Sequence, residues 1–278
     1  WIDLRHLPAE VHEQEIPEVV SFFKRYVNLD PRTELCPVRP SNHYHMGGIP
    51  TNEFGEVQDA KQKIIEGLYA VGECAAASFH GFNRLGTNSI LELITMGKIV
   101  ADRVIERLKR ESHTRPEVKA ERFRQKFERY LAATEQDNIG QIRNTLRTVM
   151  TEKVSVFRTE AGLSEAIETL RQLQVRAEKT AIIGKSLAMN QELLQRWELD
   201  NLLAVSMAIC KAALHRKESR GGHFRDDFPE RKDEFNYHTL VLMPEFGKIE
   251  LGQRKVDMSL FEARGENYEK FDIIERKY

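Results

Sequence analysis

The chain has 278 residues, of which 41% are hydrophobic and 31% are charged, and this balance excludes a disordered protein. The formal net charge of −1 gives no indication of a nucleic-acid or membrane-surface partner. No apolar run approaches the ~20 residues that span a bilayer, and no signal peptide is recognisable. Cys36, Cys74 and Cys210 lie far apart and form no CxxC pair, so we predict neither a zinc site nor a disulfide framework, and expect reduced thiols in a cytoplasmic compartment.

The first 40 residues are predicted to contain a short strand and a helix. Trp1, Ile2 and Leu4 are typical of a short strand, and apolar residues then recur at helical spacing between Ile16 and Phe23. Prolines at positions 31, 37 and 40 predict an extended connector after the helix. Because the chain starts with Trp1 and its opening is typical of a strand end that runs into a loop, we expect a fragment or a chain processed from an internal point.

Residues 41–97 hold half of the 16 glycines, which concentrate where the backbone turns tightly or approaches a ligand. The segment from Gly67 to Gly72 predicts a short, buried apolar strand that ends directly before Glu73. From Asn88 to Arg110 the apolar residues keep a continuous helical period. This region is therefore expected to combine strands and tight turns with one long helix.

Residues 113–218 are almost purely helical in pattern, with helices expected near 116–136, 139–151, 164–179 and 189–217. Few glycines or prolines interrupt them, and we predict an antiparallel bundle of three or four helices. The segment SRGGHFRDDFPER is polar and typical of a loop, and Tyr237–Met243 and Lys255–Phe261 are predicted to form two strands. The whole pattern predicts a mixed fold of the α+β or α/β class.

The first candidate site is the segment from His43 to Gly48, with the sequence HYHMGG. His43 and His45 would point to the same face of a strand, which permits a metal site, but no further Cys/His cluster completes one and we predict none. A single imidazole before two glycines suits a ligand that approaches the backbone. Spacing alone leaves a structural histidine equally consistent with the pattern.

The second candidate is Glu73, which follows the predicted strand. The carboxyl ends of strands in open α/β sheets are where such proteins bind ligands, and a carboxylate there can accept hydrogen bonds from ribose hydroxyls. A surface glutamate after a strand is an equally good interpretation of so short a pattern.

The third candidate is the segment HGFNRLGTNS, in which glycines flank Arg84 and the chain then enters a helix. Asn88 or Ser89 could cap that helix, whose N-terminus offers free N–H groups and a partial positive charge. Arg84 could bind a carboxylate through paired hydrogen bonds. The pattern fits a helix cap with a surface arginine equally well.

Three separated segments together resemble one family. CPVRPSNHYHMGGI, EGLYAVGECAAASFHGFNRLGTNSILEL and RKESRGGHFRDDFPER are similar, in order and spacing, to the succinate dehydrogenase/fumarate reductase flavoprotein subunit. FRTEAGLSEAIETL and AMNQELLQRWELDNLL also resemble its helical bundle, so the resemblance covers nearly all of the chain. It implies the C-terminal half of that subunit: the end of a capping domain (1–40), a C-terminal piece of the FAD-binding domain (41–112), a helical bundle domain (113–228) and a small β-containing C-terminal subdomain (229–278).

The resemblance also implies roles for individual residues. His43 and Arg84 are expected to bind the carboxylates of fumarate or succinate, with Arg84 polarising one of them. Glu73 is expected to bind the adenosine ribose of FAD. At the helix start, Asn88, Ser89 and Ile90 are expected to bind the cofactor, with Ser89 and Ile90 contacting the isoalloxazine. The resemblance implies that the segment with Arg220 and His223 lies near the flavin, without a role for either residue, and a structural turn there is equally consistent.

Other parts of the family's site are expected upstream of this chain. They are the GxGxxG turn that holds the FAD pyrophosphate, the histidine that can attach FAD covalently, and the arginine that protonates the substrate carbon. We therefore expect the chain alone to be inactive and to bind FAD poorly. In the complete subunit, the resemblance implies hydride transfer between flavin and substrate, with electrons passing through an iron–sulfur subunit and a quinone-linked membrane anchor at the inner face of the cell membrane.

Three other interpretations compete with this one. L-aspartate oxidase has similar HGxNRL and NS motifs, although Met46 before Gly47 and Gly48, and Gly86-Thr87 before Asn88, fit the dehydrogenase/reductase pattern better. A thiol-dependent or quinol-linked fumarate reductase is a second relative, and this half of the sequence does not distinguish it from the first interpretation. The third possibility is a non-catalytic fragment whose helical bundle docks a partner.

Overall fold

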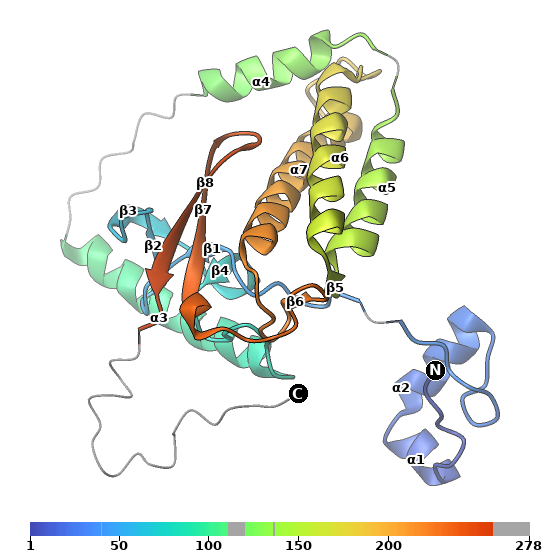
Figure 1. Ribbon diagram of the computed structural model, residues 1–278. Coiled ribbons are helices and arrows are strands. Elements are labelled where there is room, and N and C mark those ends of the chain that lie inside the picture. Colours follow the sequence, from blue (N-terminus) through green and yellow to red (C-terminus); the bar gives the residue numbers. More distant parts are fainter. Residues whose placement is uncertain (40, 111–119, 136, 258–278) are drawn as a thin grey trace, which may run out of the picture. The chain divides into compact units, whose positions relative to one another are not determined.

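A computed structural model describes residues 1–39, 41–110, 120–135 and 137–257, except the side chain of Arg122. The chain divides into two compact units, Trp1–Asn42 and His43–Tyr278, each of which is described by itself. Helices predominate, with four small two-stranded sheets among the described residues, so the mixed fold class is confirmed (Figure 1). No helix in the described residues is long and apolar enough to cross a membrane.

The first unit contains two short helices, α1 (Ala9–Gln14) and α2 (Pro17–Phe22), followed by a π-helical turn (Phe23–Val27). Proline opens α2 at a position where its missing N–H costs no helical hydrogen bond. The helix predicted around residues 16–23 is therefore confirmed. The strand predicted at the start is reduced to one antiparallel bridge between Ile2 and the buried Cys36.

The glycine-rich segment forms two small sheets before a long helix. Strand β1 (Ile49–Pro50) pairs in parallel with β4 (Ala75–Ala76), and β2 (Glu56–Gln58) pairs antiparallel with β3 (Ile64–Tyr69). Helix α3 covers Asn88–Arg110, the full length of the predicted helix.

The strand predicted between Gly67 and Gly72 is shifted toward the N-terminus. Strand β3 ends at Tyr69, and Gly72 opens a 3-10 turn that contains Glu73. The prediction that this strand is buried was wrong, since Leu68 is 50% exposed and most of β3 faces solvent in this structure. Strand β3 belongs to a two-stranded antiparallel ribbon, which cannot cover both faces of its strands.

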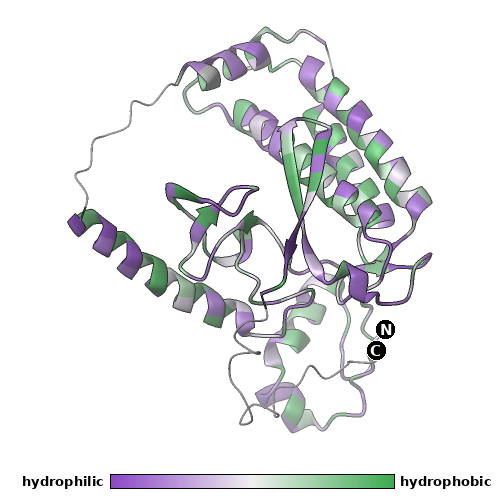
Figure 2. Cartoon of the chain, turned by 60° about the vertical axis from the view of Figure 1, so that its left-hand side comes forward, coloured by the Kyte–Doolittle hydropathy of each residue, from purple (hydrophilic) through white to green (hydrophobic). Residues whose placement is uncertain are grey.

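Among the described residues, the third region holds four α-helices: α4 (Glu121–Ala132), α5 (Ile139–Val149), α6 (Glu160–Lys179) and α7 (Gln191–His215). Residues 116–119 and 136 of the helix predicted near 116–136 lie outside the described residues. Side-chain caps start three of them: Asn138, Thr159 and Asn190 each accept a hydrogen bond from the N–H three residues later. The predicted bundle is confirmed, although Thr159 starts α6 four residues earlier than its apolar pattern indicated. In Figure 2 these helices carry apolar stripes beside polar ones.

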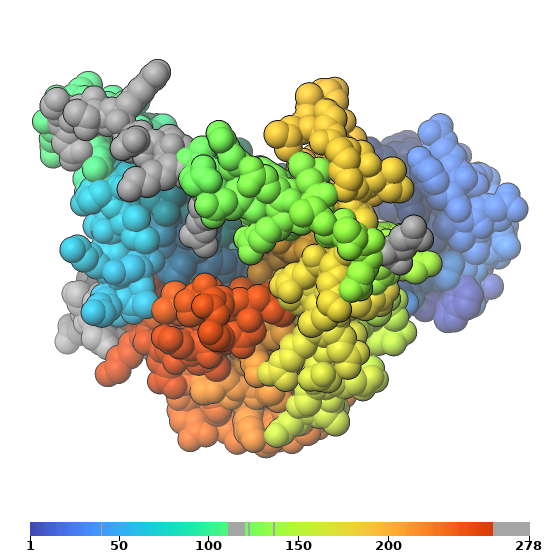
Figure 3. Space-filling model, turned by 90° about the horizontal axis from the view of Figure 1, so that it is seen from above, coloured from blue at the N-terminus to red at the C-terminus, as the bar shows by residue number. Residues whose placement is uncertain are grey.

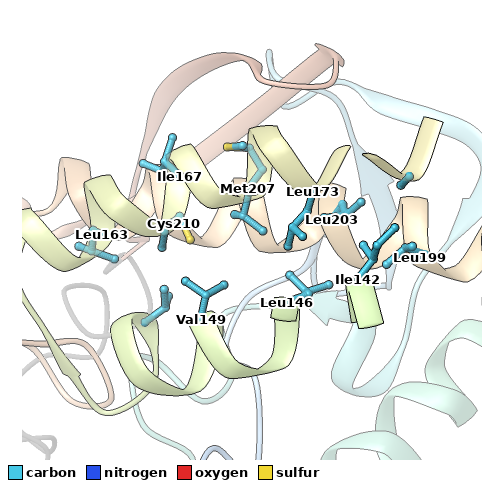
Figure 4. Packing of buried hydrophobic residues seen from close by; sticks show 14 of the residues in the cluster. Ile142, Leu146, Val149, Leu163, Ile167, Leu173, Leu199, Leu203, Met207 and Cys210 are labelled. Carbon is cyan, nitrogen blue, oxygen red and sulfur yellow. The ribbon is translucent and has the colours of Figure 1, made fainter. Parts of the chain in front are cut away.

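One hydrophobic core joins α5, α6 and α7, and Figure 4 shows its side chains converging from the three helices. Leu163, Leu170 and Leu203 are completely buried in it. The apolar residues recur every three or four positions, so each helix presents one continuous face to the other two. This cluster stabilises the bundle through burial of apolar surface.

A β-hairpin lies against the bundle. Its strands are β7 (Tyr237–Glu245) and β8 (Lys248–Lys255), and Met243, Phe246 and Ile249 pack on the helical core. Figure 3 shows the hairpin beside the helices. The first strand is confirmed, but the second was predicted too late: Gly247 adopts φ +77° and reverses the chain at once. The rest of the predicted strand, residues 258–261, lies outside the described residues.

Two further strands connect the bundle to the loop that follows α7. Strand β5 (Phe157–Arg158) pairs in parallel with β6 (Phe224–Arg225). The segment predicted as a polar loop, residues 219–231, is therefore anchored to the start of α6.

Candidate functional site

The segment from His43 to Gly48 lies beside Glu73 because β1 and β4 pair in parallel. Gly48 adopts φ +140°, and a β-carbon there would overlap the carbonyl oxygen of Cys74, so this approach of the two backbones requires glycine. The backbone N–H of His45 donates to Glu73 Oε1 at 3.2 Å. The structure thus brings together two of the segments that the sequence singled out.

Tyr44 connects this segment to the arginine loop, residues 78–87. The guanidinium carbon of Arg84 lies 4.6 Å from the centroid of the Tyr44 ring. The His80 ring meets Tyr44 with centroids 5.4 Å apart and planes at 83°, an edge-to-face contact. Tyr44 therefore touches two side chains of the loop that carries the predicted substrate residue.

His80 is in turn paired with the acidic side chain of Glu92. Its Nε2 lies 3.6 Å from Glu92 Oε2, and the two side chains are 9% and 4% exposed. Both atoms are buried without a hydrogen-bond partner. Because Glu92 belongs to the second turn of α3, this pair ties the arginine loop to the start of the helix.

The phenol of Tyr44 is influenced by the charges around it. Burial raises its pKa above the usual value, and the carboxylates of Glu92 and Glu73 act in the same direction. The Ser89 hydroxyl and Arg84 oppose them. Tyr44 is therefore neutral near pH 7 and lies within electrostatic reach of predicted substrate and cofactor residues.

Arg84 itself is half-buried. Its Nη1 donates to the carbonyl oxygen of Leu85 at 3.4 Å, and its Nε is buried without a hydrogen-bond partner. Among the described residues, no acidic side chain forms an ion pair with Arg84. A guanidinium without a protein carboxylate can bind the carboxylate of a ligand.

The arginine loop is also held from the C-terminal region of the chain. Gly222 N–H donates to the carbonyl oxygen of Phe82 at 2.8 Å, and the Arg216 guanidinium lies 4.7 Å from the Phe82 ring centroid. The Ser78 hydroxyl and His238 Nε2 are 3.1 Å apart. Segments after α7 and in β7 thus contribute to the position of Arg84.

The sequence assigned no role to Arg220 or His223, and in the structure both bind neighbouring protein groups. Arg220 donates two hydrogen bonds to the buried carboxylate of Glu218, both at 3.0 Å. His223 is buried between Arg158, 2.8 Å from Nδ1, and the Arg216 carbonyl oxygen, 3.1 Å from Nε2. Burial, followed by the positive charge of Arg158, lowers the pKa of His223 to about 4.

Apart from Glu73, the predicted cofactor residues lie at the start of α3. Asn88 is the first helical residue, so Thr87, rather than Asn88 or Ser89, occupies the position before the helix. Ser89 is half-buried and Ile90 is 63% exposed. His43 is exposed in the segment next to Tyr44. The described residues contain no group of three or more His, Cys, Asp or Glu side chains placed to hold a metal ion.

Sequence reasoning assigned no role to Tyr44, His80 or Glu92. One signal was available for Glu92, which interrupts the apolar run ILELI of a predicted helix. Tyr44 and His80 carried no such signal, because their contact depends on the pairing of strands that are far apart in the sequence.

Two family models match the chain. A fumarate reductase flavoprotein C-terminal model matches residues 143–278, and a FAD-binding domain model matches residues 1–90. The succinate dehydrogenase flavoprotein subunit of Rickettsia bellii is 35% identical over 266 residues, which cover 93% of this chain and 45% of that protein. The fumarate reductase flavoprotein subunit of Mycobacterium tuberculosis is 36% identical over 270 residues, again covering 93% of this chain and 45% of that protein.

Solved structures match a similar share of the chain. A quinol-fumarate reductase with menaquinol molecules matches with a TM-score of 0.84 and 34% identity, covering 92% of this chain and 44% of that chain. An E. coli quinol fumarate reductase variant matches with a TM-score of 0.83 and 34% identity, covering 91% and 43%. The chain therefore spans less than half the length of the relatives it matches.

Proposed function

Because the chain belongs to the succinate dehydrogenase/fumarate reductase flavoprotein family and matches its C-terminal half, we propose that it forms part of a flavoprotein that interconverts fumarate and succinate. The observation that carries the proposal is Arg84. It lies in a glycine-flanked loop at the start of α3, stacked on Tyr44 and without an ionic partner among the described residues. A dicarboxylate is a ligand that such a guanidinium binds through two parallel hydrogen bonds.

The side chains near Arg84 fit a flavin cofactor. The start of α3 offers the backbone N–H of Ser89, where the helix dipole favours negative charge. The exposed Ile90 supplies apolar surface at the same place. Glu73 is exposed and could accept hydrogen bonds from the ribose hydroxyls of FAD. FAD, when bound, supplies the hydride exchange with the substrate.

The contribution of this chain to the reaction is to hold and polarise the substrate. Arg84 binds one carboxylate, and its fixed positive charge stabilises the negative charge that builds up there during the reaction. His43 binds the other carboxylate, and together the two residues orient the substrate carbons. Protonation of the second carbon falls to an arginine outside residues 1–278, so this chain alone is expected to be inactive.

The proposal extends to partners and location. Electrons would pass to or from an iron–sulfur subunit and a quinone-linked membrane anchor, and the flavoprotein would be peripheral at the inner face of the cell membrane. The relatives are flavoprotein subunits of succinate dehydrogenases and fumarate reductases, which supports this assembly.

The test is fumarate reduction by the flavin-loaded protein that contains this chain, with a reduced viologen dye as electron donor. We expect fumarate-dependent oxidation of the dye, inhibited by malonate, and no oxidation with aspartate as a control substrate. A purified flavoprotein that neither reduces fumarate nor oxidises succinate would refute the proposed function. Production of hydrogen peroxide from L-aspartate would instead support an aspartate oxidase.

A further inference from the structure

We propose that Tyr44 is a positioning residue that holds the Arg84 guanidinium in the orientation required to bind a substrate carboxylate. The inference rests on the proposed function, because it concerns the same arginine. It adds a residue from a different segment of the chain.

The contacts of Arg84 indicate that the Tyr44 ring is its main support. The guanidinium carbon lies 4.6 Å from the ring centroid, within the range of a cation–π contact. The hydrogen bond to the Leu85 carbonyl oxygen is 3.4 Å long and therefore weak. Since Arg84 Nε has no hydrogen-bond partner among the described residues, the aromatic face is the strongest interaction that restricts this side chain.

The Tyr44 ring is itself fixed from a second direction. His80 contacts it edge-to-face at 83°, and His80 is backed by Glu92 from the second turn of α3. Both supporting side chains are nine-tenths or more buried, so neither has room to rotate away. Glu92 contacts His80, His80 contacts Tyr44, and Tyr44 contacts Arg84. These contacts therefore fix the position of the guanidinium relative to α3.

The ring rather than the hydroxyl of Tyr44 performs this role. Arg84 lies over the ring, and the phenol remains neutral near pH 7 because burial and the neighbouring carboxylates raise its pKa. A neutral phenol offers no ionic attraction to the guanidinium. Phenylalanine should therefore replace tyrosine, whereas an aliphatic residue of similar volume should not.

The test compares Tyr44→Phe, Tyr44→Leu and Arg84→Ala in the flavin-loaded protein that contains this chain. Tyr26→Leu is the matched control, because Tyr26 is 76% exposed in the other compact unit. The readout is the Kd of malonate, titrated through the change it causes in flavin absorbance. We expect Tyr44→Leu to raise the Kd about tenfold, the loss of one desolvated cation–π contact, while Tyr44→Phe stays within about threefold of the unmodified protein.

A second measurement needs no Tyr44 substitution. The Nε proton of Arg84, identified by its absence from the NMR spectrum of Arg84→Lys, should resonate upfield of the other arginine side chains because of the Tyr44 ring current. An unshifted proton would overturn the inference even if Tyr44→Leu fails to fold.

The outcomes separate the inference from the function it rests on. If Arg84→Ala leaves the malonate Kd unchanged, the proposed function fails. If Arg84→Ala weakens malonate binding but Tyr44→Leu behaves like Tyr44→Phe, the proposed function stands and the role of Tyr44 is refuted.

Discussion

Replacement of Arg84 by alanine is the sharpest perturbation of the proposed site. The substitution removes a guanidinium that we expect to bind a carboxylate through paired hydrogen bonds and to stabilise the charge that builds up on it. Loss of one preorganised electrostatic donor of this kind costs about 3 kcal/mol or more of transition-state binding, which is a fall of about 10²-fold or more in kcat/KM. The protein itself should lose little stability, because Arg84 is half-buried and forms no ion pair with any described residue.

The assay is fumarate reduction by the flavin-loaded protein, with kcat and KM measured separately and the flavin content of each variant determined by absorbance. Arg84→Lys keeps the charge but loses the planar fork, so it should recover only part of the lost activity. Arg147→Ala, on the exposed side of α5, is the matched control and should be unaffected. Unchanged fumarate reduction by Arg84→Ala would refute the assignment of Arg84, and an equal loss in Arg147→Ala would show a nonspecific effect.

Three further predictions concern other parts of the molecule. His43→Ala should chiefly weaken dicarboxylate binding, so an unaltered malonate Kd would contradict its role. Leu170→Ala, at a completely buried position of the bundle, should lower the free energy of unfolding by ~2–5 kcal/mol in a urea titration, whereas the same change at Leu187, which is 69% exposed, should cost far less. The pKa of His223 is lowered to about 4 in the folded protein, below its unfolded value, so protonation opposes folding: this contribution to stability is complete above pH 6.5 and is lost as the pH falls toward 4. Urea titrations at pH 7 and pH 4.5 should therefore show a smaller pH-dependent loss for His223→Gln than for the unmodified protein, and equal losses would contradict this explanation.

The helices were predictable because their signals are local. The run from Asn88 to Arg110 keeps one period throughout, and the structure forms a helix over the same residues. Where a side-chain cap overrides the apolar pattern, as Thr159 does at α6, the predicted boundary was displaced. The second hairpin strand was displaced because Gly247 reverses the chain earlier than the apolar residues indicated.

The candidate site was predictable only in part, because most of its contacts join distant segments. The sequence marked Glu73 as a candidate by its position after a predicted strand, and Arg84 by its position within a glycine-flanked loop. It could not indicate that Tyr44 contacts both Arg84 and His80, since that depends on the parallel pairing of β1 with β4. The contact between His80 and Glu92 likewise depends on the direction of α3 relative to the loop that precedes it.

The arginine loop shows how distant segments can prepare a site for its ligand. Ser78 is held by His238, Phe82 by Arg216 and Gly222, and His80 by Glu92, so the loop is fixed at three residues that precede Arg84. Helix α3 begins at Asn88, four residues after Arg84. The anchors come from β7, from the loop after α7 and from α3. A loop fixed in this way loses little conformational entropy when a carboxylate binds, so more of the binding energy is available to orient the substrate. The bundle and hairpin therefore contribute to substrate binding indirectly, by holding the loop that presents Arg84.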